Sequence, residues 1–226
     1  MIIALIPTYG QRGYLDEMLQ WLDLSGQVDA VEVLRQDEPL GSALARNQLI
    51  QQATAKYGYD NQFLMLDDDC KFNRFSQIRK GAEIIDREND IGIVSFPLGG
   101  ITQNGYAESL IVKHCWLING RLLAAGANYT PGELYDSLDF CLQSYLLGYR
   151  NVITKEAFIW HDVAIDRSVR WRLVREGKQL GRSGIAERYI DYLETIQEPY
   201  AVKLNDKAIE LHNQRNHQLI YGTHSN

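Results

Sequence analysis

The chain has 226 residues, of which 45% are hydrophobic, so it is long enough to bury a core as one domain. Its net charge of −6 argues against wholesale coating of nucleic acid, and its three widely spaced cysteines lack the pairing of a zinc site or a disulfide framework, so we expect reduced, buried thiols. The apolar run Ile2–Ile6 is interrupted by Pro7 and has no basic leader, which argues against a signal peptide or an integral membrane segment and favours a cytoplasmic protein.

The first half of the chain alternates predicted strands with predicted helices. After a short β-branched strand, Leu15, Leu19 and Leu22 recur at helical spacing. A second helix is expected to have Ser42 as its cap and to end near Gly58. In chain order we expect a strand at 2–7, a helix at 13–24, a strand at 30–36, a helix at 42–58, a strand at 62–67, a helix at 75–89 and a strand at 91–97. Strands separated by helices of this length predict an α/β fold, with a mostly parallel sheet flanked by helices on both faces.

The second half is predicted to extend this sheet and to end in helix. We expect a strand at 110–119, a loop at 126–133, an amphipathic helix at 136–149 ended by Gly148, and a strand at 151–162. From residue 184 the sequence is predicted to be helical, and it is polar with scattered aromatic residues. Because there is no low-complexity linker, we expect a single domain: a core at 1–183 and a C-terminal helical extension of the same domain at 184–226.

Three consecutive aspartates, Asp67, Asp68 and Asp69, occur where the predicted third strand ends. One interpretation is that one of them caps the next helix while the others are solvated in a turn. Crowding three like charges at a strand end instead favours a bound cation, because hard divalent ions such as Mg²⁺ or Mn²⁺ take carboxylate oxygens and leave positions for phosphate. In an extended segment Asp67 and Asp69 would point to one side and Asp68 to the other.

The first strand is followed only by Gly10 and Gly13, without a Walker or Rossmann glycine pattern, which disfavours a kinase or a dehydrogenase.

Five segments carry a family resemblance in their order along the chain: IPTYG, LGSALARNQLI, FLMLDDD, GELYDSLDFCLQSYLLGY and WHD. Over residues 1–162 the sequence resembles the GT-A fold glycosyltransferases, in particular the family 2-like group of inverting sugar transferases. The resemblance implies a Rossmann-like domain with a bound Mn²⁺ or Mg²⁺. It also implies transfer of a sugar from a nucleotide-sugar donor, usually a uridine diphosphate (UDP) sugar, to an acceptor hydroxyl with inversion.

The resemblance assigns roles to individual residues around the aspartate-any-aspartate motif. At the metal it implies Asp69 as the direct ligand, Asp67 as a ribose or metal contact, and His161 as the third protein ligand. A lone histidine that closes a strand is more often structural, which is the alternative for His161. Around the nucleotide it implies contacts from Pro7, Thr8, Tyr9, Asp37, Arg46 and Asn47, with Asp68 as the spacer inside the motif.

Asp136 and Asp139 are three residues apart, and hence on one face near the start of a predicted helix, where negative charge is stabilised. One interpretation is a helix cap with its capping-box partner. The segment also resembles the family's Glu-Asp-any-Asp element, which supplies the catalytic base. With Asp139 aligned to the last aspartate, Asp136 replaces the glutamate and Ser137 falls where the family often has its aspartate. Asp136 is the favoured base, with Asp139 as the alternative; the base takes the proton of the acceptor hydroxyl while the metal stabilises the departing diphosphate.

The segment 166–182 contains six basic and two acidic side chains around Trp171. It is interpreted as a solvated helix face, as a loop that closes over the donor diphosphate, or as a stripe that binds nucleic acid. The acceptor is accordingly expected to be a glycan precursor or a hydroxymethylated base in DNA. A flipped base would stack on Tyr106, Trp116 or Tyr129.

Two further classes of function remain open from the sequence. A nucleotidyltransferase would need a glycine-rich loop with a basic residue after the first strand, where only Arg12 is present. A non-catalytic module that binds sugar nucleotides or nucleic acid would have less reason to keep Asp67 and Asp69.

Overall fold

The computed structural model describes residues 1–9, 15–36, 41–72, 77–96, 106–109, 112, 115–130, 136–154 and 159–161. The backbone alone is described for Tyr9, Asp136, Leu138 and Ile159–His161. Asp37, the basic segment 166–182, the boundary at residue 183 and the expected extension at 184–226 lie outside the described residues. Within the described part, no helix combines the length and the apolar character needed to cross a membrane.

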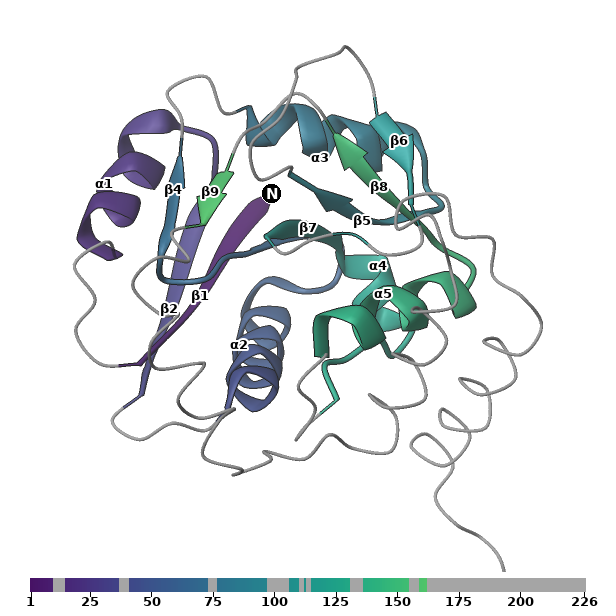
Figure 1. The fold of residues 1–226 in the computed structure, drawn as a ribbon, viewed down its shortest axis with the longest axis horizontal. Helices are drawn as coiled ribbons and strands as arrows, with labels where there is room; N and C mark the ends of the chain where they lie inside the picture. Colours follow the sequence, from purple (N-terminus) through teal and green to yellow (C-terminus); the bar gives the residue numbers. More distant parts are fainter. Residues whose placement is uncertain are drawn as a thin grey trace, which may run out of the picture.

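In the described residues, seven strands form one sheet, ordered β2-β1-β3-β7-β5-β8-β6 (Figure 1). The strands are β1 (Ile2–Tyr9), β2 (Ala30–Gln36), β3 (Gln62–Met65), β5 (Ile91–Ser95), β6 (Tyr106–Glu108), β7 (Trp116–Asn119) and β8 (Arg150–Thr154). The pairings give β1, β2, β3, β5 and β8 one direction, whereas β6 and β7 run the opposite way. The predicted α/β fold is confirmed, but the sheet is mixed, because β7 lies between β3 and β5 and is antiparallel to both.

Helices cover both faces of this sheet (Figure 1). Helices α1 (Leu15–Ser25) and α3 (Ile78–Arg87) lie on one face, and α2 (Ser42–Tyr57), α4 (Gly120–Ala124) and α5 (Asp136–Leu146) lie on the other. Strand β1, which lies between β2 and β3, alternates between two buried clusters: Ile2, Ala4 and Ile6 pack on the α1 and α3 side, and Ile3 and Leu5 pack on the α2 side. A strand buried on both faces needs a nearly continuous apolar run, which explains the composition of this segment.

Helix α2 ends as predicted but begins differently. Gly58, at a φ of 79°, closes the helix, and its N–H donates to the carbonyl of Thr54. The N-cap is Gly41, at a φ of 86°, and no side chain caps the helix. The prediction of Ser42 as the cap is therefore wrong, because Ser42 is already the first helical residue.

The strand predicted at 151–162 is two strands in two sheets. Its first part is β8, and its last part, β9 (Ile159–His161), pairs antiparallel with β4 (Cys70–Phe72). Trp21 of α1 stacks on Phe72, with ring centroids 4.1 Å apart and planes 7° apart, and so covers β4. This small sheet brings the backbone of His161 beside the segment that follows the three aspartates.

Arg150 ties the start of β8 to the turn before β5. Its guanidinium donates to both carboxylate oxygens of Asp90, at 2.7 and 2.8 Å, and to Glu88 at 2.9 Å. Hydrogen bonds from the Tyr106 hydroxyl and from Arg150 lower the pKa of Glu88, and hydrogen bonds from Arg150 lower the pKa of Asp90. The cluster thus links β5, β6 and β8 at one end of the sheet.

The change Arg150→Gln is expected to lower the free energy of unfolding at neutral pH. The difference from wild type is expected to become smaller as the pH falls. A carboxyl group whose pKa is lowered by folding stabilises the folded state above its unfolded pKa of about 4, and this contribution is lost as the pH falls through the lowered pKa. Urea midpoints of variant and wild type should therefore converge below about pH 4. Arg87→Gln, at an exposed arginine 3.4 Å from Glu88, is the control and should show little effect. A difference that stays constant across this pH range would contradict the prediction.

Candidate active site

The carboxyl ends of β1 and β3 meet at one edge of the sheet, where ligands of open α/β sheets gather. At this edge the hydroxyl of Thr8 donates to Oδ2 of Asp68 at 2.7 Å, and both residues are buried. Residues 67–70 form a turn in which the N–H of Cys70 donates to the carbonyl of Asp67 at 3.2 Å. The extended conformation predicted as far as Asp67 is therefore wrong: β3 ends at Met65, the chain continues as a turn, and the carboxylate of Asp68 accepts from Thr8 of β1.

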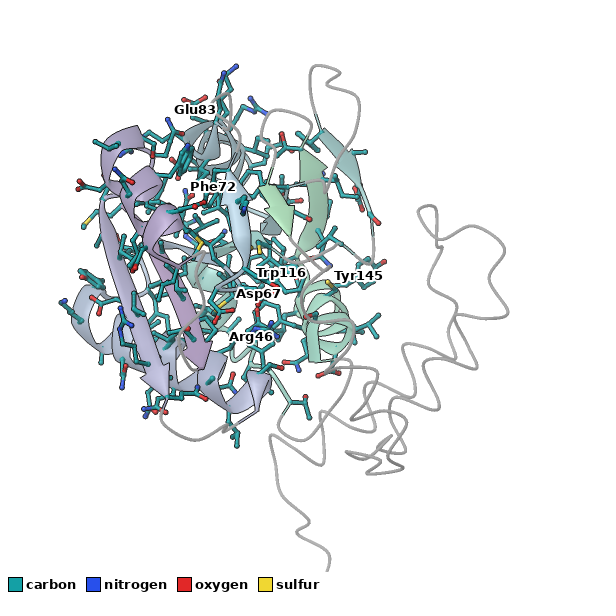
Figure 2. All side chains as sticks on the ribbon, turned by 60° about the vertical axis from the view of Figure 1, so that its left-hand side comes forward. Arg46, Asp67, Phe72, Glu83, Trp116 and Tyr145 are labelled. Carbon is teal, nitrogen blue, oxygen red and sulfur yellow. The ribbon has the colours of Figure 1, made fainter. Side chains whose placement is uncertain are left out.

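Arg46 of α2 reaches the same turn. Its Nη2 donates to Oδ1 of Asp67 at 2.8 Å, and its guanidinium lies over the ring of Tyr129, 5.2 Å from the centroid. Figure 2 shows Arg46 and Asp67 side by side. Because Arg46 is only 7% exposed, water solvates its guanidinium poorly, and Asp67 supplies the opposite charge. The structure thus shows Arg46 as a support for a site carboxylate.

The turn continues into a buried pair of thiols. Asp69 is 7% exposed, and the next residue, Cys70, has its Sγ 2.9 Å from the Sγ of Cys115. The hydrogen bond with Cys115 and burial raise the pKa of Cys70 well above its usual range, so the thiol stays protonated. All three cysteines are free and buried, Cys141 included, which confirms the expectation of reduced thiols.

His161 lies directly opposite Cys70 in the register of β4 and β9. Its backbone is therefore placed beside the residue that follows Asp69, although the two are far apart in sequence. The other candidates at this edge are placed by β1: Pro7, Thr8 and Tyr9 pair with the last residues of β2. β2 ends one residue before Asp37.

Asp139 is a buried residue of helix α5. It is 1% exposed, and its Oδ2 accepts hydrogen bonds from the hydroxyl of Thr130 and, at 2.7 Å, from the amide of Gln143. Asp136 is the first residue of the same helix. The two candidate bases therefore differ in their surroundings. Asp139 accepts hydrogen bonds from Thr130 and Gln143, whereas Asp136 is the first residue of the helix.

The aromatic residues expected to stack on a flipped base belong to the core and to an ion cluster. Trp116 and Tyr129 are fully buried, and the indole N–H of Trp116 donates to the hydroxyl of Tyr129 at 3.1 Å. The ring of Tyr129 also stacks on Phe140 at 4.5 Å between centroids. Tyr106 is hydrogen-bonded to Glu88. The stacking prediction is wrong for Trp116 and Tyr129, because a residue with no exposed surface cannot receive a base.

The donor groups of the turn suit a hard divalent cation. Three carboxylates and the guanidinium of Arg46 leave two negative charges, which a divalent ion would balance. Among the side chains that the structure describes, no three of His, Cys, Asp or Glu converge on one point. Mg²⁺-type sites commonly use only one or two carboxylates and complete their coordination with water and substrate phosphates. The residues present therefore fit an ion that is held together with a diphosphate.

The sequence matches no protein-family model. It matches no curated protein either. Its structure, however, is similar to solved glycosyltransferase structures. One is S. aureus TarS (residues 1–349) in complex with UDP-GlcNAc, with a TM-score of 0.53 and 15% identity over 70% of this chain. A second is GalNAc-T7 with UDP, GalNAc and Mn²⁺, with a TM-score of 0.51 and 13% identity over 71% of this chain. A third is the mannosyltransferase PcManGT from Pyrobaculum calidifontis in complex with GDP-Man and Mn²⁺, with a TM-score of 0.56 and 15% identity over 77% of this chain.

The chain spans 57%, 43% and 60% of the lengths of these three structures. Similarity at this level of identity shows a shared fold. The chain therefore has the GT-A fold of nucleotide-sugar glycosyltransferases, which confirms the fold expected from the five sequence segments.

Proposed function

We propose that this protein is a metal-dependent glycosyltransferase that transfers a sugar from a nucleoside diphosphate sugar, with inversion, to an acceptor hydroxyl. The observation that carries the proposal is the aspartate turn after β3, where Thr8 and Arg46 hold two of three adjacent carboxylates at the ligand-binding edge of the sheet. The GT-A fold supports it, since the similar structures contain UDP-GlcNAc, UDP or GDP-Man, two of them with Mn²⁺. We expect a UDP-sugar as the donor.

Asp67, Asp69 and His161 are the residues that we expect to hold Mn²⁺ or Mg²⁺, and the bound ion would balance the charge that develops on the leaving diphosphate. Arg46 keeps the carboxylate of Asp67 in one orientation through a short ion pair. Thr8 does the same for Asp68, and so joins the turn to the end of β1. The pocket for the nucleobase is expected beside the paired ends of β1 and β2, at Pro7, Thr8, Tyr9 and Asp37.

Asp136 is the catalytic base in this proposal. Asp139 is less suited to that role, because it is 1% exposed and its Oδ2 already accepts two hydrogen bonds. Asp136 would accept the proton of the acceptor hydroxyl as the hydroxyl oxygen bonds to the anomeric carbon and the bond to the diphosphate breaks. Attack from the face opposite the diphosphate inverts the anomeric centre.

For the acceptor we propose a glycan precursor rather than a base in DNA. The aromatic platform that a flipped base would need is not available from Trp116 or Tyr129, which are fully buried. The basic segment 166–182 is then expected to contact the donor diphosphate or an acidic acceptor.

The test is release of free nucleoside diphosphate from a panel of nucleotide sugars with Mn²⁺ and without an acceptor. Slow release is expected from one donor class, and we expect Asp69→Asn to weaken Mn²⁺-dependent binding of the nucleotide at least about tenfold. Asp60→Asn, at an exposed turn residue, is the matched control and should behave as wild type. If no nucleotide sugar binds in the presence of Mn²⁺, the proposal fails. Release of pyrophosphate from a nucleoside triphosphate and a sugar phosphate would indicate a nucleotidyltransferase instead.

A further inference from the structure

Two side-chain amides, one from α2 and one from α5, hold one short segment. Asn47 of α2 bonds both backbone groups of Tyr129: its Oδ1 accepts from the N–H at 2.9 Å, and its Nδ2 donates to the carbonyl at 2.6 Å. Gln143 of α5 does the same for Asn128, accepting at 3.1 Å and donating at 2.9 Å. Tyr129 is buried, whereas Asn128 is exposed and Asn47 is partly buried. The two carboxamides satisfy the N–H and the carbonyl of both residues. We name residues 128–130 the bridging segment.

The side chains of the bridging segment extend these contacts in both directions. Toward α2, the ring of Tyr129 lies under Arg46, which bonds Asp67. Toward α5, the same ring stacks on Phe140, and the hydroxyl of Thr130 donates to Asp139. A continuous series of buried contacts therefore leads from the aspartate turn to the helix that begins at Asp136.

The exposure of these residues shows that this series is part of the interior. Tyr129 and Phe140 have no exposed surface, and Thr130, Asp139 and Gln143 are each at most 6% exposed. Buried polar groups of this kind have few alternative partners, so each bond holds its neighbours in one arrangement. An amide is required at position 47, because the Tyr129 backbone presents one donor and one acceptor to the same side chain.

We propose that Asn47 is a positioning residue, which acts through the bridging segment to hold α5, and with it Asp136, in register with the aspartate turn. The inference rests on the proposed function and adds to it how the donor side and the base side are held at a fixed separation. This separation matters because a displacement of about 1 Å between reacting groups can lower a rate by about two orders of magnitude.

Asn47→Asp tests this role with almost no change in shape. Aspartate still accepts from the N–H of Tyr129 but sets a second acceptor against its carbonyl, which loosens the bridging segment. With the nucleotide sugar that wild type hydrolyses, we expect kcat to fall at least about tenfold while the donor KM stays within about threefold. The affinity of the corresponding nucleoside diphosphate for the protein with Mn²⁺ should also be nearly unchanged.

Asn61→Asp is the matched control. The Nδ2 of Asn61 donates to the carbonyl of Tyr57 at 2.6 Å, at the far end of the same helix, so the same type of bond is removed away from the site. It should lower thermal stability but leave kcat unchanged. A second pair of variants covers the case in which Asn47→Asp does not fold: Thr130→Val should lower kcat, and Thr130→Ser, which keeps the hydroxyl, should restore it.

The outcomes separate the two proposals. A wild-type kcat in Asn47→Asp, or in Thr130→Val where Asn47→Asp does not fold, would overturn the role of Asn47 and leave the proposed function intact. An equal loss of kcat in Asn61→Asp would also overturn it, because the effect would then be one of stability. A wild type that neither binds nor hydrolyses any nucleotide sugar would overturn the proposed function and this inference with it.

Discussion

Asp136→Asn is expected to lower sugar transfer by about 10²- to 10⁴-fold, the range for loss of a general base. Asparagine cannot take the proton of the acceptor hydroxyl. The effect should appear in kcat, with little change in thermal stability, since Asp136 is the first residue of α5 and a charge at a helix start contributes only about 0.3–1 kcal/mol. Initial rates of transfer and melting temperatures measure the two quantities separately.

The same substitution at Asp139 provides the contrast. Its Oδ2 accepts from Thr130 and Gln143, and the carbonyl oxygen of asparagine can keep both bonds, so we expect less than about a tenfold loss of transfer. If Asp139→Asn loses as much activity as Asp136→Asn while remaining folded, the assignment of the base is wrong and Asp139 takes that role.

Arg46→Met is expected to destabilise the protein by about 3 kcal/mol, since removing one partner of a buried ion pair leaves the other charge without compensation. Breaking a buried ion pair costs about 3–5 kcal/mol. The side chain of Arg46 is 8% exposed and that of Asp67 is 24% exposed, so water partly solvates Asp67 and the expected cost is at the lower end of this range. Methionine keeps much of the volume beside Tyr129 but not the charge over its ring. The loss should be visible as a lower urea midpoint and as weaker Mn²⁺-dependent binding of a nucleoside diphosphate.

Arg79→Met is the matched control for this prediction. Arg79 bonds Asp29 at the same distance of 2.8 Å, but the side chains are 46% and 30% exposed. An exposed pair of this kind contributes less than about 1 kcal/mol. Equal destabilisation by the two variants would contradict the prediction, because the buried Arg46–Asp67 pair would then contribute no more than an exposed pair.

Local patterns were sufficient for most of the first half of the fold. The spacing of Leu15 and Leu22 and the buried alternation of β1 depend on nearby residues, and α1 and β1 were predicted accordingly. The position of β7 in the sheet could not be predicted from neighbouring residues. The insertion of this strand between β3 and β5 depends on contacts between residues that are far apart in the sequence. The split of segment 151–162 was missed for the same reason: β9 pairs with a three-residue strand whose sequence is too short to show a period.

The candidate site shows the same division between local and long-range information. The three aspartates are visible in the sequence, but the bonds of Asp67 to Arg46 and of Asp68 to Thr8 depend on tertiary placement. Tyr129 was misread, since the surrounding GANYT has the composition of an exposed loop. Its burial is compatible with a loop because the carboxamide of Asn47 bonds both the N–H and the carbonyl of Tyr129.

The pairing of β4 with β9 is expected to form after the contacts of the aspartate turn. Asp67 meets Arg46 across 21 positions of sequence, whereas Cys70 meets His161 across about 90, and closing a longer loop costs more conformational entropy. During synthesis the seven strands of the main sheet are all present once residue 154 has been added, before β9 exists. The contacts of Asp67 and Asp68 can therefore form on a nascent chain that still lacks β9, and the pairing of β4 with β9 forms later.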